Sequence, residues 1–156
     1  MKYSGIDMHW VDSSTGRKFV PHVIEPAVGI NRIFLMLLND VYREADVDGE
    51  SRVYLAFNKS IAPYQVAVFP LVSNKPQLVM KAKEVFNSLL GEYRVTWDDR
   101  GNIGKRYRSQ DEIGTPNCVT IDYQTLEDGT VTVRERDTML QKRIQLAELK
   151  SYLSSY

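Results

Sequence analysis

A buried strand, an amphipathic helix and a second strand in succession limit the fold of this chain more than any other pattern in it. The first strand is Gln65 to Pro70, a short apolar run typical of a strand that is covered on both faces. Pro76 suits the first turn of the helix, which ends near Gly91. Its apolar face consists of Val79, Ala82, Phe86, Leu89 and Leu90. Arg94 to Trp97 is the second strand, so the pattern predicts a β-α-β unit.

The segments that follow predict further helix and strand. Residues 103–113 form a short helix closed by Gly114. Residues 118–123 and 130–136 alternate apolar and polar side chains across Glu127-Asp128-Gly129, which predicts an antiparallel hairpin. A last strand at Ile144 and a terminal helix complete the pattern, the helix with Leu146, Leu149 and Leu153. The predicted fold class is α/β, with a mixed five-stranded sheet and about three helices.

The N-terminal part predicts two short strands and a helix that it cannot bury alone. The strands are residues 8–11 and 18–25, and residues 29–42 carry apolar side chains around most of a helical circumference. Such a helix has to be buried on several sides. We therefore interpret this strand-strand-helix segment as a remnant of something larger.

Domain boundaries follow from composition. Residues 44–51 are acidic, contain a glycine and have few apolar side chains, which is typical of a connection between domains. We expect one domain in residues 1–44, a linker in 45–60 and a second domain in 61–156.

Composition excludes several classes of protein. The 156 residues include 20 basic and 20 acidic side chains, so nucleic-acid binding through bulk positive charge is not expected. Cys118 is the only cysteine and His9 and His22 are the only histidines, so we expect no disulfide and no metal site. The longest apolar run, Ile33 to Leu38, is far shorter than the ~20 residues of a membrane span. We expect a cytoplasmic protein without a membrane partner.

Residues 100–112 are the densest polar segment and a candidate surface for nucleic acid. Four basic side chains lie within nine residues, and an aromatic residue lies among them. Lysine and arginine bind phosphates, aromatic and guanidinium planes stack on unpaired bases, and Gln, Asp and Glu can contact base edges. The alternative is a solvated helix whose arginines pair with its own acids. The candidate nucleic-acid-binding residues of this segment are Lys105, Arg106, Tyr107, Arg108, Gln110, Asp111 and Glu112.

A second basic pair lies in the last part of the predicted hairpin. On a strand, Arg134 and Arg136 point to one face and Glu135 points to the other. Beside the basic helix, the two arginines would complete a single positive shelf. Ion pairs with acidic residues across the sheet are an equally open interpretation.

A third feature precedes the apolar helix. Glu25 and Pro26 end the predicted strand, and Arg32 lies in the first turns of the helix. Helix N-termini favour phosphate, and an arginine there adds a bidentate donor. Glu25 can bind an ammonium group. An incidental ion pair between Glu25 and Arg32 is the alternative.

Together these segments resemble one known family. The C-terminal part of the dimeric glycyl-tRNA synthetases is similar, in order, to Gln-Val-Ala-Val-Phe-Pro-Leu-Val at 65–72, Gly-Asn-Ile-Gly-Lys-Arg-Tyr-Arg at 101–108, Gln-Asp-Glu-Ile-Gly-Thr-Pro at 110–116, Thr-Leu-Glu-Asp-Gly-Thr-Val-Thr-Val at 125–133 and Arg-Glu-Arg-Asp-Thr-Met at 134–139. Residues 21–38 resemble motif 3, the last signature of class II synthetases. The resemblance extends over nearly the whole chain.

The resemblance implies an anticodon-binding domain from about residue 61, preceded by the end of a class II catalytic domain. It implies that Glu25 binds glycine beside Ala27, although the family usually has serine where this chain has alanine. The residues implied to bind ATP are Gly29, Ile30, Asn31 and Arg32. The implied parent enzyme is a homodimer that uses ATP and Mg²⁺ as substrates, whereas no cofactor is expected in this chain alone.

The functional expectation is recognition of the tRNA-Gly anticodon as the C-terminal part of a glycine–tRNA ligase, with the rest of the catalytic domain as a partner. Motifs 1 and 2 are not found in these residues, so the charge that develops during adenylate formation would lack its stabilising groups. We therefore expect that this polypeptide alone does not activate glycine. The alternative is a free-standing paralogue, a non-catalytic nucleic-acid-binding or dimerising accessory protein, which Ala27 favours. The absence of G-x-G-x-x-G and P-loop motifs argues against an unrelated nucleotide-binding enzyme.

Overall fold

The computed structural model describes residue 3 and residues 5–47 and 49–155. The chain divides into two compact units, Met1–Phe34 and Leu35–Tyr156. In the smaller unit, β1 (Trp10–Val11) and β2 (Lys18–Phe19) pair antiparallel, and the rings of Trp10 and Phe19 meet edge to face at 5.9 Å. The second predicted strand is shorter than expected, because residues 20–29 have no regular secondary structure.

Helix α1 (Ile30–Val41) begins in the smaller unit and ends in the larger one, close to the predicted 29–42. Val41, at its end, is buried with Phe57 and Ala62 in a small apolar cluster. Leu35 and Met36 are exposed to 68% and 71%, so much of the apolar surface of α1 is not covered. Among the described residues, no helix is long and apolar enough to cross a membrane.

The larger unit is built on a five-stranded sheet of order β6-β5-β7-β8-β9, in which β5 pairs parallel with β6 and β7 while the other pairs are antiparallel. This confirms the predicted mixed sheet. The strands are β5 (Val66–Pro70), β6 (Val95–Trp97), β7 (Asn117–Ile121), β8 (Thr130–Glu135) and β9 (Gln141–Gln145).

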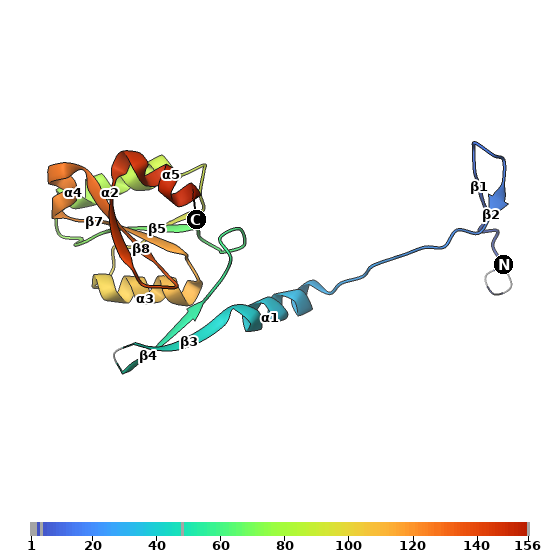
Figure 1. Ribbon diagram of the computed structural model, residues 1–156, viewed down its shortest axis with the longest axis horizontal. Coiled ribbons are helices and arrows are strands. Elements are labelled where there is room, and N and C mark those ends of the chain that lie inside the picture. Colours follow the sequence, from blue (N-terminus) through green and yellow to red (C-terminus); the bar gives the residue numbers. More distant parts are fainter. Residues whose placement is uncertain (1–2, 4, 48, 156) are drawn as a thin grey trace. The chain divides into compact units, whose positions relative to one another are not determined.

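Helices cover both faces of this sheet, with α2 (Pro76–Leu89) and α5 (Leu149–Ser154) on one face and α3 (Ile103–Ile113) on the other (Figure 1). The alternation of the strands separates two cores. Val66, Val68, Val119 and Ile121 pack with α2 and α5, whereas Ala67, Phe69 and Cys118 pack beneath α3. The apolar run at 65–70 is therefore explained by burial on both faces.

Both ends of α3 are fixed by the residues that the sequence suggests. The Asn102 side chain accepts a hydrogen bond from the Lys105 backbone N–H, at 2.9 Å. Gly114 ends the helix in the left-handed conformation, with φ 88°, and its N–H donates to the carbonyls of Gln110 and Asp111. Both ends of α3 are therefore capped, which fixes where the helix begins and ends.

Two elements differ from the prediction. Residues expected to form a linker contribute to a hairpin of β3 (Tyr42–Val47) and β4 (Glu50–Leu55), which turns at Gly49 and packs against α3. The strands β7 and β8 are antiparallel neighbours as predicted, but they are connected by α4 (Tyr123–Asp128) rather than by a tight turn. Asp122 and Thr125 form a reciprocal capping box that begins α4. The short η1 (Leu146–Glu148) precedes α5.

Replacing Gly114 tests the contact between α3 and the hairpin. An alanine Cβ at this position would lie 2.5 Å from Phe57 Cδ2 and 2.7 Å from the Leu55 carbonyl oxygen. Gly91 has nearly the same φ, 89°, but its Cβ would meet no atom within 4 Å. We expect Gly91→Ala to cost ~1 kcal/mol in urea unfolding from backbone strain alone. Gly114→Ala is expected to cost about 2 kcal/mol more from overpacking, and equal losses would contradict the contact.

The buried thiol of Cys118 predicts a specific pH dependence. Burial raises its pKa from 9.0 to about 12, so above pH 9.0 the unfolded thiol ionises while the native one stays protonated. The stability that the protonated thiol contributes is fully present below the pKa of the unfolded state, 9.0. It is lost as pH rises toward the pKa of the folded state, about 12. Between about pH 8 and about pH 10.5 the thiol should cost about 2 kcal/mol of unfolding free energy. Cys118→Ala should lack that loss in parallel urea titrations, and identical pH profiles would refute it.

Candidate nucleic-acid interface

Arg106 is buried, although it was a candidate for RNA contact. Its guanidinium donates to four backbone carbonyls, those of Pro70 at 2.6 Å, Gly101 at 2.8 Å, Arg100 at 2.9 Å and Asp99 at 3.1 Å. The side chain thereby ties the end of β5 to the loop that precedes α3. Its role in the structure is to hold this loop, and four of its five N–H donors are used in doing so.

Asp111 and Arg134 are also buried, as the two halves of a bidentate ion pair. Arg134 Nη1 and Nη2 donate to the two carboxylate oxygens of Asp111 at 2.9 and 3.0 Å. From the hairpin, Arg52 Nε donates to the same carboxylate at 2.9 Å. Burial alone would lower the pKa of Arg134, but the hydrogen bonds and charge of Asp111 raise it. This three-residue network joins α3, β8 and β4.

Gln110 and Arg136 complete the set of buried candidates. The Gln110 side chain accepts a hydrogen bond from the Thr115 hydroxyl at 2.7 Å. Arg136 Nη1 donates to the carbonyls of Gly114 and Phe57, and the other side of its guanidinium pairs with Asp137 at 2.8 and 3.1 Å. Arg136 thus pairs with an aspartate, but with its neighbour in sequence rather than across the sheet.

The prediction of a single positive shelf therefore needs correction. Arg106, Gln110, Asp111, Arg134 and Arg136 are each buried and hydrogen-bonded within the protein, so they do not form an open positive surface. The remaining four keep access to solvent: Lys105, Arg108 and Glu112 are exposed, and Tyr107 is half-buried.

A pocket of about 450 Å³ lies beside these accessible residues, between α3, the hairpin and the end of β8. Its charged lining consists of Glu50, Arg52, Arg108, Asp111 and Arg134, and Tyr107 supplies an aromatic wall. Three arginines face two carboxylates, which leaves one positive charge in excess. We call this cavity the α3 pocket.

The accessible groups of the α3 pocket are held in different ways. The Tyr107 hydroxyl is hydrogen-bonded to Thr120 Oγ1 at 2.6 Å, and Arg134 lies 4.9 Å over the ring. Burial raises the pKa of Tyr107, so the phenol stays protonated. Arg108 pairs with Glu50 at 3.3 Å across the pocket mouth, and both side chains are more than half exposed. An exposed ion pair of this kind contributes little to stability, so a phosphate could replace Glu50 as the partner of Arg108 at little cost.

Among the motif 3 residues, those from Gly29 to Arg32 lie at the start of α1. The Gly29 carbonyl accepts the N–H groups of Arg32 and Ile33, and the Arg32 side chain folds over Gly29. Glu25, Ala27, Ile30 and Asn31 are exposed. The structure has no ion pair between the described residues Glu25 and Arg32, so the open alternative of an incidental pair is not found. In the described part of the chain, no cluster of three His, Cys, Asp or Glu side chains suits a metal ion.

The sequence analysis missed the contribution of the hairpin to the α3 pocket. Arg52 stacks over the Tyr54 ring at 4.2 Å and reaches Asp111, which lies 59 residues away in sequence. The available signal was the run Arg-Val-Tyr-Leu at 52–55 after Gly49, which combines strand-forming residues with a turn former.

Comparison with known proteins gives one matching family. The family described as "Anticodon binding domain" matches residues 65–156. Glycine–tRNA ligase of Clostridium acetobutylicum is 46% identical over 98% of this chain, and that of Borreliella burgdorferi is 50% identical over 92%. The chain spans about a third of the length of these curated relatives, 33% and 32%. The similarities agree with the family resemblance of the sequence motifs.

Replacing Asp111 tests the buried network. Asp111→Asn keeps the shape but leaves Arg52 and Arg134 without their counter-charge, which should destabilise the fold by about 3 kcal/mol or more. The neighbouring Glu112→Gln removes the same charge from an exposed position and should change stability by less than ~0.5 kcal/mol. Urea unfolding of both variants measures the difference. A loss of similar size in both would show that the network is not a structural centre.

Proposed function

The chain belongs to the anticodon-binding-domain family, and we propose that it recognises a tRNA anticodon as part of a glycine–tRNA ligase. The match of the family over residues 65–156 carries this proposal. The α3 pocket supports it, since its excess positive charge and half-buried aromatic ring suit unpaired RNA.

The accessible residues of α3 would bind different parts of the RNA. Lys105 and Arg108 project from the helix surface and would hold phosphates of the anticodon loop. The Tyr107 ring is held in place by its contact with Arg134 and by the hydrogen bond of its hydroxyl to Thr120. It offers a surface on which an unpaired base can stack. The buried residues act indirectly: Asp111 and Arg106 position the helix from which these groups project.

We infer tRNA-Gly as the substrate because the relatives of this chain are glycine–tRNA ligases. Glycine anticodons share cytosines at their second and third positions. A carboxylate near the interface suits cytosine, whose exocyclic amino group donates a hydrogen bond. Glu112, exposed on α3, is a candidate for this contact or for a structural role.

For the parent enzyme we propose a homodimer that uses ATP and Mg²⁺ as substrates. The exposed positions of Glu25 and Ala27 suit contact with glycine, and Arg32 with Gly29, Ile30 and Asn31 would contact ATP. The exposed apolar side chains of Leu35 and Met36 support the rest of the catalytic domain as a partner. We propose domains at 1–44 and 61–156, with the intervening residues 45–60 contributing to the hairpin, and a cytoplasmic location.

A second candidate function follows from Ala27. It occupies a position where the synthetases usually have serine, so a non-catalytic paralogue that binds nucleic acid or dimerises is the alternative. Pyrophosphate exchange distinguishes the two. We expect none from this chain alone, and activity on adding the missing catalytic segments supports a ligase, whereas continued inactivity supports the accessory protein.

Titration with a glycine anticodon stem-loop tests the proposed function. We expect affinity to fall as salt rises, and to fall when the two shared cytosines are replaced. Arg108→Gln should reduce the slope of log K against log salt by about 0.7, because one phosphate contact is lost. Lys83→Gln, the same charge change at an exposed position on α2, is the matched control. Equal affinity for a scrambled loop would overturn the proposal.

A further inference from the structure

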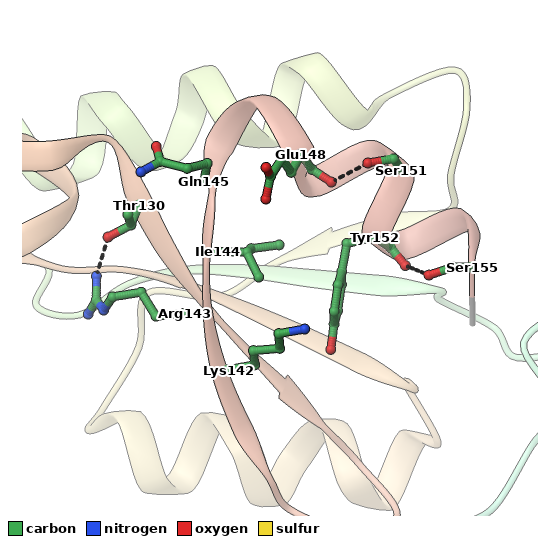
Figure 2. A pocket seen from close by; sticks show the side chains of 9 residues that line it. All are labelled: Thr130, Lys142, Arg143, Ile144, Gln145, Glu148, Ser151, Tyr152 and Ser155. Carbon is green, nitrogen blue, oxygen red and sulfur yellow. Dashed lines mark hydrogen bonds between the residues drawn. The ribbon is translucent and has the colours of Figure 1, made fainter.

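A second pocket, of about 580 Å³, lies where the edge strand β9 meets η1 and α5 (Figure 2). Its volume is within the range of small-ligand sites. It shares no lining residue with the α3 pocket. Ile144 forms part of its wall and also belongs to the main core with Leu149 and Leu153, so the pocket is built on fixed elements. We call it the β9 pocket.

One side of the β9 pocket is an aromatic ring beside an amine. Lys142 Nζ lies 5.1 Å from the centroid of the Tyr152 ring, and Figure 2 shows the lysine side chain extending toward that ring. Tyr152 is partly buried against the main core, which limits the motion of the ring. A fixed aromatic surface with a neighbouring cation is the combination with which proteins bind single-stranded nucleic acid, through stacking and phosphate contact.

The other side carries polar groups that the fold does not use. Within the described residues, the side chains of Gln145 and Glu148 make no hydrogen bond or ion pair, and both are exposed. The remaining polar side chains are engaged. Ser151 and Ser155 donate to carbonyls of their own helix at 2.8 Å, and Arg143 donates to Thr130 Oγ1 at 2.9 Å. A carboxylate and an amide are thus available to a ligand.

This availability distinguishes the β9 pocket from the α3 pocket. In the α3 pocket the Asp111 carboxylate is buried and already accepts three hydrogen bonds from arginines, so little of its capacity remains for reading a base. In the β9 pocket the Glu148 carboxylate retains its full accepting capacity. A carboxylate accepts from the exocyclic amino group of cytosine, whereas uracil presents a carbonyl oxygen at that position.

We propose that the β9 pocket binds one cytosine nucleotide of single-stranded RNA. The base stacks on the Tyr152 ring, its amino group donates to Glu148, and Lys142 holds a flanking phosphate. This proposal rests on the proposed function and adds to it a base-reading site outside α3. Lysine on an exposed edge strand can also serve only to prevent strand-to-strand aggregation, and that role predicts no effect on RNA binding.

The first test measures binding of the full chain to the glycine anticodon stem-loop by fluorescence anisotropy. Tyr152→Leu keeps an apolar side chain against the core but removes the stacking surface, and should weaken binding about tenfold. Lys142→Ala should reduce the slope of log K against log salt by about 0.7. Lys150→Gln changes a charge on α5 outside the pocket, where Lys150 pairs with Glu92, and should leave both quantities unchanged.

The second test addresses the identity of the base. Wild-type protein should prefer the stem-loop to loops in which either shared cytosine is replaced by uridine. Glu148→Gln should abolish the preference at one of the two positions, because an amide can donate to the uracil carbonyl. Thermal melts of each variant exclude loss of fold, and the exposed Lys142 and Glu148 variants carry the test if Tyr152→Leu is unstable.

The outcomes separate the two proposals. If the wild-type chain binds no stem-loop, the proposed function itself fails. If it binds, but the Tyr152 and Lys142 variants keep wild-type affinity and salt dependence, the β9 pocket is not part of the interface. If these variants bind more weakly while Glu148→Gln retains the full preference for cytosine at both positions, the pocket does not read the base, and that part of the proposal is overturned.

Discussion

The larger unit depends on one buried carboxylate, that of Asp111, shared by Arg52 and Arg134. Removing a carboxylate from water costs several kcal/mol, and here three charge-assisted hydrogen bonds of 2.9 to 3.0 Å offset that cost. The three side chains come from α3, β4 and β8, so a single ion cluster fixes the helix between the sheet and the hairpin. Because two guanidinium groups share one negative charge, the same cluster leaves the α3 pocket positive.

The sequence predicted the two faces of α3 correctly but not which of them faces solvent. Helical spacing places Lys105 and Arg108 on one face and Arg106 and Gln110 on another, and the structure exposes the first pair and buries the second. Charge alone misled the assignment, because an arginine can be buried when backbone carbonyls accept most of its N–H donors, as they do for Arg106. Ile103 and Tyr107, which pack beneath α3, were the local signal for its inner side.

The mixed sheet, its helices and the family were predictable because they depend on local periodicity and on long ordered motifs. The hairpin was not, because its strands are stabilised by groups far away in sequence. Arg52 stabilises the hairpin through hydrogen bonds to the Asp111 carboxylate and the Arg136 carbonyl. These acceptors lie 59 and 84 residues further along the chain, so the sequence near Arg52 does not reveal them. The acidic, glycine-containing composition of 44–51 reflects the exposed turn and the outer face of the hairpin rather than a linker without structure. Similarly, the capping box of Asp122 and Thr125 turned a predicted tight turn into the short helix α4.

The edge strand β9 connects the two pockets. Its first residue, Gln141, pairs with Arg134 of the α3 pocket, and its last, Gln145, lines the β9 pocket. At ~3.3 Å per residue, these ends are about 13 Å apart. Consecutive unpaired nucleotides can follow such a strand, with phosphates held near α3 and a base read beyond its far end. Phosphate binding and base reading would then depend on different residues, since the Asp111 carboxylate accepts three hydrogen bonds from arginines and the Glu148 carboxylate accepts none from the described residues.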